Sequence, residues 1–364
     1  MSDVQLFSRM VRYGRGQHAG HPGVEMNRLR HLGTQRAARR ALQRPDGLGT
    51  EEAVALNTRA GKALAEGRRS EAEAEARLVI DTHANAGFAD DRYLVARWIL
   101  ARILAQSGRH GEALEELTQF LDALPPVRKF AIFAVRQRLG LSRELIYQAR
   151  YDEAETEARA AFEYCQKLPP DGTADYWRFH AVGNVLLAMT LRGLAADAES
   201  AARQAIREAE AAAQQAETDD ESAFKSGHVL DLLHRGLAAS LNGQGRYAEA
   251  EALLRDLLSE HPADFGIRTY LAIAQLGLGD FAEAEAEARQ AEQESRDRYS
   301  PVHYVTLHAG TVLGMALARQ GRVDEARRQL QDNAAAWAEH FGDAHPKTIA
   351  ARAELANLDG DAAP

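Results

Sequence analysis

The stretch G-R-Y-A-E-A-E-A-L-L, residues 245–254, contains the signals that decide how this chain folds. Gly245 can adopt the left-handed conformation that ends one helix and lets the chain reverse. Glu249 follows where a carboxylate meets the positive end of a new helix dipole. Ala250 and Leu254 are four residues apart and therefore share one face of that new helix. The stretch predicts a tight turn between two helices, the second with a buried face.

The same pattern occurs seven times along the chain, at spacings of 34 to 52 residues. Its first position is Gly in six cases and Ala149 in the other, and the residue before its final alanine is always acidic. A repeated pair of helices predicts an array in which each unit buries its apolar face against the next. The final alanines of the pattern are Ala72, Ala113, Ala154, Ala198, Ala250, Ala284 and Ala326.

The residues four and seven positions after each of these alanines test whether the second helix has a buried face. Each alanine forms a triad with these two residues. Of the 21 residues in the seven triads, all but Asn333 are apolar. That regularity indicates an amphipathic helix in every repeat. The step of 52 residues contains a polar run, residues 214–227, where we expect an extended helix and a loop.

These features resemble the tetratricopeptide repeat family, whose unit is two antiparallel helices. The prevailing period near 42 residues and the stretch F-G-D-A-H-P-K-T from Phe341 resemble its long-repeat, kinesin-light-chain-like subgroup. The resemblance implies an all-α, right-handed α–α superhelix of about seven helix pairs over residues 51–346. It further implies a capping helix over 347–358, followed by a disordered tail over 359–364.

Composition narrows the class of protein. The 364 residues carry a formal charge of −9 and one cysteine, Cys165, which excludes an internal disulfide framework. No apolar run approaches the ~20 residues that span a bilayer, and the N-terminus lacks the pattern of a secretory signal. We therefore expect a cytoplasmic protein without a membrane span.

Residues 1–50 differ from the rest. They hold nine arginines and three acids, a balance of +6, so the remaining residues carry −15. We expect a basic, partly ordered segment that could contact nucleic acid or an anionic membrane. Docking onto the acidic repeats is at least as consistent with these charges. Six of the nine arginines lie within residues 24–44, which could form a helix, and are the ones predicted to make this contact: Arg28, Arg30, Arg36, Arg39, Arg40 and Arg44.

The family resemblance implies a concave groove, lined by the first helix of each pair, that binds a partner polypeptide. Arginine forks there could hold carboxylates, and asparagine amides could pair with a peptide backbone. The alternative is that these arginines form salt bridges or solvated helix faces, and that the groove's tryptophan is a core residue. The predicted groove residues are Asn57, Trp98, Arg102, Arg136, Arg143, His180, Arg235 and Asn242.

Catalytic chemistry has little support in the sequence. His340, Asp343 and His345 lie within six residues, but a zinc site needs three or four ligands in a defined geometry. No nucleotide-binding glycine loop and no nucleophile elbow is present. We therefore predict no catalytic residues, no metal and no cofactor.

The sequence as a whole predicts a non-catalytic, regulatory scaffold or adaptor that binds a protein or peptide, possibly an acidic one, in its concave groove. The alternative function is a regulator that contacts nucleic acid through the basic arm or responds to a signal peptide. An enzyme is the least favoured of the three interpretations.

Overall fold

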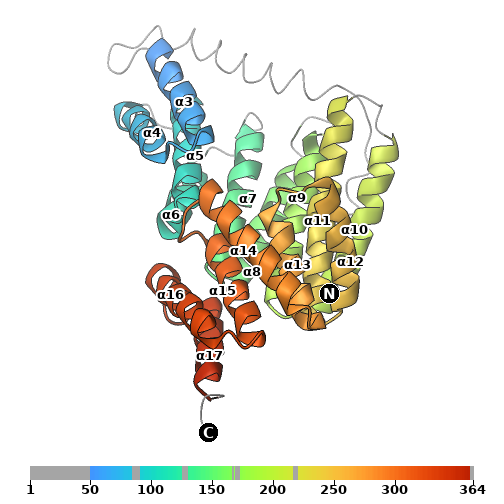
Figure 1. Cartoon of the computed structure of the whole chain (residues 1–364). Helices are drawn as coiled ribbons and strands as arrows, with labels where there is room; N and C mark the ends of the chain where they lie inside the picture. Colours follow the sequence, from blue (N-terminus) through green and yellow to red (C-terminus); the bar gives the residue numbers. More distant parts are fainter. Residues whose placement is uncertain are drawn as a thin grey trace.

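The computed structural model describes residues 50–83, 91–124, 130–165, 168, 173–215 and 220–360, and within them the chain is an array of α-helices without strands (Figure 1). The helices are α3 (Thr50–Ala65), α4 (Arg69–His83), α5 (Asp91–Gln106), α6 (His110–Ala123), α7 (Ala131–Tyr147), α8 (Tyr151–Cys165), α9 (Thr173–Leu191), α10 (Ala195–Gln215), α11 (Asp220–Gly243), α12 (Tyr247–Glu260), α13 (Phe265–Leu278), α14 (Phe281–Arg298), α15 (Tyr304–Arg319), α16 (Val323–Phe341) and α17 (Pro346–Gly360).

The helices form seven consecutive pairs, α3/α4 to α15/α16, and α17 follows the last pair. The predicted all-α solenoid is confirmed. Helices α10 and α11 have 21 and 24 residues, so the extended helix expected beside the polar run is also present. The final helix begins at Pro346, where proline is well tolerated, and continues to Gly360, two residues beyond the expected end of the cap.

The core lies between the helices of each pair and between neighbouring pairs. All the triad residues identified from the sequence are buried, including the polar exception Asn333, which is 5% exposed. Alanines at the first position of each triad let the two helices of a pair approach closely. The phase of all seven second helices is therefore as the sequence predicts.

The turns within the pairs take the left-handed conformation. The six glycines that open the repeated pattern have φ between 73° and 93°, and Ala149 at the remaining turn has φ of 58°. Glycine adopts this conformation without steric cost, whereas an L-residue with a Cβ is strained by it. The third pair thus keeps the turn geometry of the others at some cost in stability.

The arginine of the repeated pattern has a role that the sequence does not reveal. Arg246 contacts Glu249 at the start of its own helix at 2.6 Å and also reaches Glu199 of the preceding pair at 2.6 Å. Arg322 does the same with Glu325 and with Glu285 of the preceding pair. These ion pairs join consecutive second helices along one edge of the array.

The array also contacts itself over long sequence distances. Arg69 Nη2 donates to the carbonyl oxygen of Arg298 at 2.6 Å, and the backbone N–H of Tyr304 donates to His110 Nε2 at 3.2 Å. His345 Nε2 lies 3.0 Å from the carbonyl oxygen of Tyr147. Figure 1 shows α14 and α15, in orange, beside the blue-green helices of the first three pairs. We call the contacts between residues 298–304 and these first three pairs the seam.

The described helices include none with the length and apolar character needed to cross a membrane. Cys165 is 3% exposed at the end of α8, and burial raises the pKa of its thiol to about 12. A thiol with so high a pKa carries almost no thiolate at neutral pH.

Candidate functional site

The predicted groove residues all lie on the first helices of their pairs, and the structure brings one group of them together around Trp98. The guanidinium carbon of Arg102 lies 4.9 Å from the centre of the Trp98 ring, and that of Arg136 lies 4.3 Å from it. Arg102 follows Trp98 by one turn of α5, whereas Arg136 comes from α7 of the next pair. Two cations therefore lie against one partly buried indole.

The group continues onto α9 through Trp177, which is not among the predicted groove residues. Trp177 lies 5.7 Å from the guanidinium carbon of Arg136, measured to its ring centre. The ring of His180 lies 5.6 Å from the ring of Trp177 and 4.5 Å from that of Tyr176. We call Trp98, Arg102, Arg136, Trp177 and His180 the Trp98 cluster.

A sequence signal for Trp177 exists. It precedes His180 by three residues, so the two side chains are neighbours on one helix face. Nothing in the sequence, however, shows that Arg136 reaches this face from the preceding pair, because that contact depends on how consecutive pairs are rotated.

Arg143 lies two turns beyond Arg136 on α7, where the array meets the seam. Its neighbours include Tyr147 one turn later and Tyr299 from the end of α14. Burial acts to lower the pKa of Arg143, but the charges of Tyr147, Glu144 and Tyr299 outweigh it and raise the pKa above its ordinary value. Arg102 also faces Tyr299, and desolvation followed by the charge of Arg143 lowers its pKa. Protein surrounds both arginines on several sides. Their side chains nevertheless remain exposed to water.

The other three predicted residues make internal contacts. Asn57 Nδ2 donates to the carbonyl oxygen of Arg92 on α5 at 3.0 Å, and Asn242 Nδ2 donates to that of Tyr270 on α13 at 2.9 Å. Arg235 Nη1 forms an ion pair with Asp264 at 3.0 Å. These bonds join one pair to the next, so we do not include the three residues in the contact surface proposed below.

A buried histidine network lies at the seam. His110 Nδ1 is 2.7 Å from Glu144 Oε2, and its other nitrogen accepts the N–H of Tyr304. His303 stacks on Tyr299 with ring centres 4.3 Å apart, and burial lowers its pKa well below the usual value. Protein groups therefore occupy both ring nitrogens of His110. The network therefore has a structural role in joining the two ends of the array.

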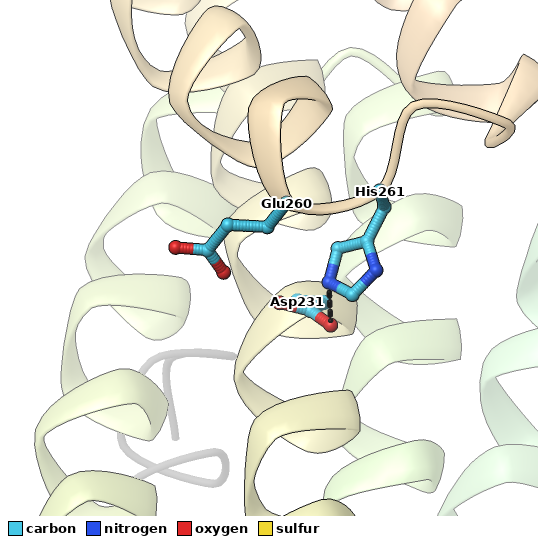
Figure 2. A group of neighbouring side chains, drawn as sticks. All are labelled: Asp231, Glu260 and His261. Carbon is cyan, nitrogen blue, oxygen red and sulfur yellow. Dashed lines mark ion pairs between the residues drawn. The ribbon is translucent and has the colours of Figure 1, made fainter.

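A group with metal-ligand chemistry that is not among the predicted sites lies between α11 and the turn after α12. Figure 2 shows Asp231, Glu260 and His261, whose ligand atoms all lie within 4.8 Å of one another. His261 Nε2 and Asp231 Oδ2 form an ion pair at 2.7 Å, and Glu260 is exposed. Asp231 precedes Glu260 by 29 residues, so no compact motif indicates the group. The contacts in the structure are those of a surface ion pair beside a solvated carboxylate.

The three residues near the last turn that could suggest a metal site do not converge. Asp343 Oδ1 contacts Arg352 Nη2 at 2.6 Å, whereas His345 is buried and stacks on Trp337 with ring centres 5.4 Å apart. His345 Nδ1 accepts the N–H of Lys347 at the start of α17. This stretch forms a turn and the start of α17.

The predicted basic arm, with Arg28, Arg30, Arg36, Arg39, Arg40 and Arg44, lies outside the described residues. Its contacts with nucleic acid, membrane or the repeats stay predictions, and no other observation supports nucleic-acid binding.

Three segments of the chain match models described as tetratricopeptide repeat, over residues 94–119, 241–309 and 306–347. They fall on the second pair and on the region from the end of α11 to the start of α17. The chain therefore contains tetratricopeptide repeats, which are modules of protein-interaction scaffolds.

Several solved structures are similar in fold. A tetratricopeptide repeat protein from Parabacteroides merdae is 14% identical, with a TM-score of 0.48 over 85% of this chain and 99% of that one. A Rap protein complexed with competence and sporulation factor is 12% identical, with a TM-score of 0.48 over 85% and 98%. The TPR2AB domain of yeast Sti1 in a pHSP90 complex is 12% identical, with a TM-score of 0.30 over 71% and 95%. No curated protein sequence matches this chain.

Proposed function

We propose that this protein is a non-catalytic scaffold, with a regulatory role, that holds an acidic segment of a partner polypeptide against the Trp98 cluster and Arg143. Tetratricopeptide repeats form curved arrays whose extended surfaces bind other chains. The long spacing of most repeats further supports placing it in the kinesin-light-chain-like subgroup.

The observation that carries the proposal is that the guanidinium groups of Arg102 and Arg136 both lie against the ring of Trp98. Stacking on an aromatic face leaves the N–H edges of a guanidinium available for a carboxylate. Arg102 and Arg143 are exposed, and neither forms an ion pair with any residue that the structure describes. Positive charge without a carboxylate partner is uncommon in this acidic protein, and it favours an acidic ligand.

The aromatic rings add a second kind of contact. Trp98 and Trp177 are partly buried, so part of each ring contacts the core and part faces outward. Tryptophan and arginine are the residues that most often dominate the binding energy of interfaces. A segment with carboxylates and one or two apolar side chains fits this surface.

The test is binding of a fluorescent decapeptide of glutamate and leucine, with a lysine and leucine decapeptide as the charge control. The double variant Arg136→Glu, Arg143→Glu should raise the dissociation constant for the acidic peptide at least about tenfold, since each lost charge-assisted contact is worth ~1.5 to 3 kcal/mol. Added salt should also weaken binding.

The helical signal and the melting temperature of the double variant must remain close to those of the parent, because a misfolded variant would lose binding for an unrelated reason. Unchanged binding by a folded double variant would show that the partner surface lies elsewhere.

A further inference from the structure

Asp231, Glu260 and His261 combine one imidazole with two carboxylates, a set of donors that binds divalent metal ions in proteins. Each residue offers one ligand atom, and the three atoms lie within 4.8 Å of one another. Figure 2 shows the imidazole of His261 pointing toward Asp231, with Nε2 at 2.7 Å from Oδ2. The fold thus gathers three donors that are far apart in the sequence around one point on the surface.

The backbone that carries these donors is well fixed. Asp231 lies on α11, and only 16% of its side chain is exposed. His261 ends α12, where its N–H donates to the carbonyl oxygen of Leu257 at 2.9 Å and its own carbonyl oxygen accepts the N–H of Asp264 at 3.1 Å. The side chains of Glu260 and His261 are exposed and can rotate. A metal ion could therefore bind without any movement of the helices.

The separations suit a small transition-metal ion. Zinc binds nitrogen and oxygen ligands at ~2.0 to 2.2 Å, so two ligand atoms of a tetrahedral site are about 3.4 Å apart. His261 Nε2 and Asp231 Oδ2 share a proton at 2.7 Å, and a metal ion in place of that proton would move them apart by roughly 0.7 Å. The other two separations both involve Glu260, whose exposed side chain can close them by rotation.

The local charge favours a cation. Glu260 is the last residue of α12, at the end of the helix where the dipole places partial negative charge. Arg235 follows Asp231 by one turn of α11, but its ion pair with Asp264 at 3.0 Å neutralises it. Within the described part of the chain, neither Asp231 nor Glu260 forms an ion pair with an arginine or a lysine. The two carboxylates therefore retain the charge that would neutralise a divalent ion.

We propose that Asp231, Glu260 and His261 bind one divalent transition-metal ion such as zinc, with water completing the coordination. An imidazole ligand favours zinc, nickel or copper, whereas magnesium and calcium prefer oxygen ligands. The bound ion ties α11 to the end of α12 and so joins the two helices of the fifth pair. This site shares no residue with the Trp98 cluster or with Arg143, and it is independent of the proposed function.

Calorimetric titration of the full chain with zinc chloride tests the site, in a buffer that does not bind metal and without a polyhistidine tag. Magnesium chloride is the comparison ion. The variants are His261→Ala and Asp231→Asn, and the matched control is His340→Ala. His340 is also an exposed histidine at the end of a second helix, since it lies in the last turn of α16.

The parent should bind zinc saturably, and magnesium should bind much more weakly. His261→Ala and Asp231→Asn should each weaken zinc binding at least about tenfold, because loss of a residue that merely supports a metal ligand already costs ~10- to 100-fold. His340→Ala should leave the affinity unchanged. Zinc should also raise the melting temperature of the parent more than that of His261→Ala, since an ion that binds the folded state stabilises it.

Absence of saturable zinc binding by the parent would overturn the site. Equal weakening by His261→Ala and His340→Ala would also overturn it, because zinc would then bind surface histidines without regard to their neighbours. Magnesium binding as tight as that of zinc would contradict the part assigned to the imidazole. The helical signal of each variant must match that of the parent, and Asp231→Asn, which keeps the shape of the side chain, decides the result if His261→Ala loses helix.

Discussion

His110 on α6 and Glu144 on α7 form a 2.7 Å hydrogen bond between side chains that are each 1% exposed. The N–H of Tyr304 donates to the other nitrogen of the imidazole, so the proton of a neutral His110 lies on Nδ1 and is donated to the carboxylate. This buried hydrogen bond thus joins the second and third helix pairs. It also orients His110 Nε2 as an acceptor toward Tyr304 of the seventh helix pair. We regard it as the central contact of the seam.

Removal of the imidazole should destabilise the protein strongly. His110→Ala leaves the Glu144 carboxylate buried without its partner, a change that costs about 3 to 5 kcal/mol in other proteins. Glu144→Gln keeps an oxygen that can accept from Nδ1 and removes the charge, so its cost should be smaller. Denaturant unfolding of both variants measures the difference. A loss below ~1 kcal/mol for His110→Ala would show that the seam opens in solution.

Close packing within the sixth pair provides a matched test of helical phase. Ala284 is fully buried and Ala282, two residues earlier on α14, is exposed. Ala284→Leu should cost about 1 to 3 kcal/mol through overpacking, whereas Ala282→Leu should change stability by less than ~0.5 kcal/mol. The same substitution on two faces of one helix separates packing from helix propensity. Similar losses from the two variants would contradict the assigned phase.

The sequence predicts the parts of this fold that depend on local spacing. Turn glycines, the acidic residue that follows them and the buried triads all recur within a few residues of one another, so their physical meaning is visible in any one repeat. Ala250 and Leu254 illustrate this, because their burial follows from helical periodicity alone.

The seam and much of the candidate site could not be predicted in this way. His110 and Tyr304 are 194 residues apart, and they meet only because small rotations between successive pairs accumulate along the array. The same reason hides the contact of Arg136 with Trp177. The hydrogen bond from Asn57 Nδ2 to the carbonyl oxygen of Arg92 on α5 is another contact between consecutive first helices that the pattern within one repeat does not predict.

The turn at Ala149 offers a stabilising substitution. Its φ of 58° is positive, as is that of the glycine at each of the other six turns. Ala149→Gly should stabilise the protein by about 0.5 to 1 kcal/mol, since relief of a strain of ~1 to 2 kcal/mol exceeds the added entropy of the unfolded chain. Ala211→Gly, at an exposed position within α10, should instead destabilise by roughly 0.5 to 1 kcal/mol. Melting curves of the two variants should therefore shift in opposite directions, and a downward shift for Ala149→Gly would contradict the strain argument.

The last helix should become more stable as the pH rises above 8. Lys347 Nζ lies 2.9 Å from His308 Nε2, and burial lowers the pKa of Lys347 from 10.5 to about 8. Between these two values the unfolded chain binds a proton at Lys347 that the folded protein has lost, so the free energy of unfolding increases with pH. Below pH 8 both states are protonated, and the folded state carries the cost of a buried cation near the positive end of α17.

Lys347→Met removes the titrating group and keeps the aliphatic stem, so the difference in stability between parent and variant should change between pH 8 and 10. Chemical denaturation at both pH values measures that difference, and an unchanged difference would show that Lys347 is solvated.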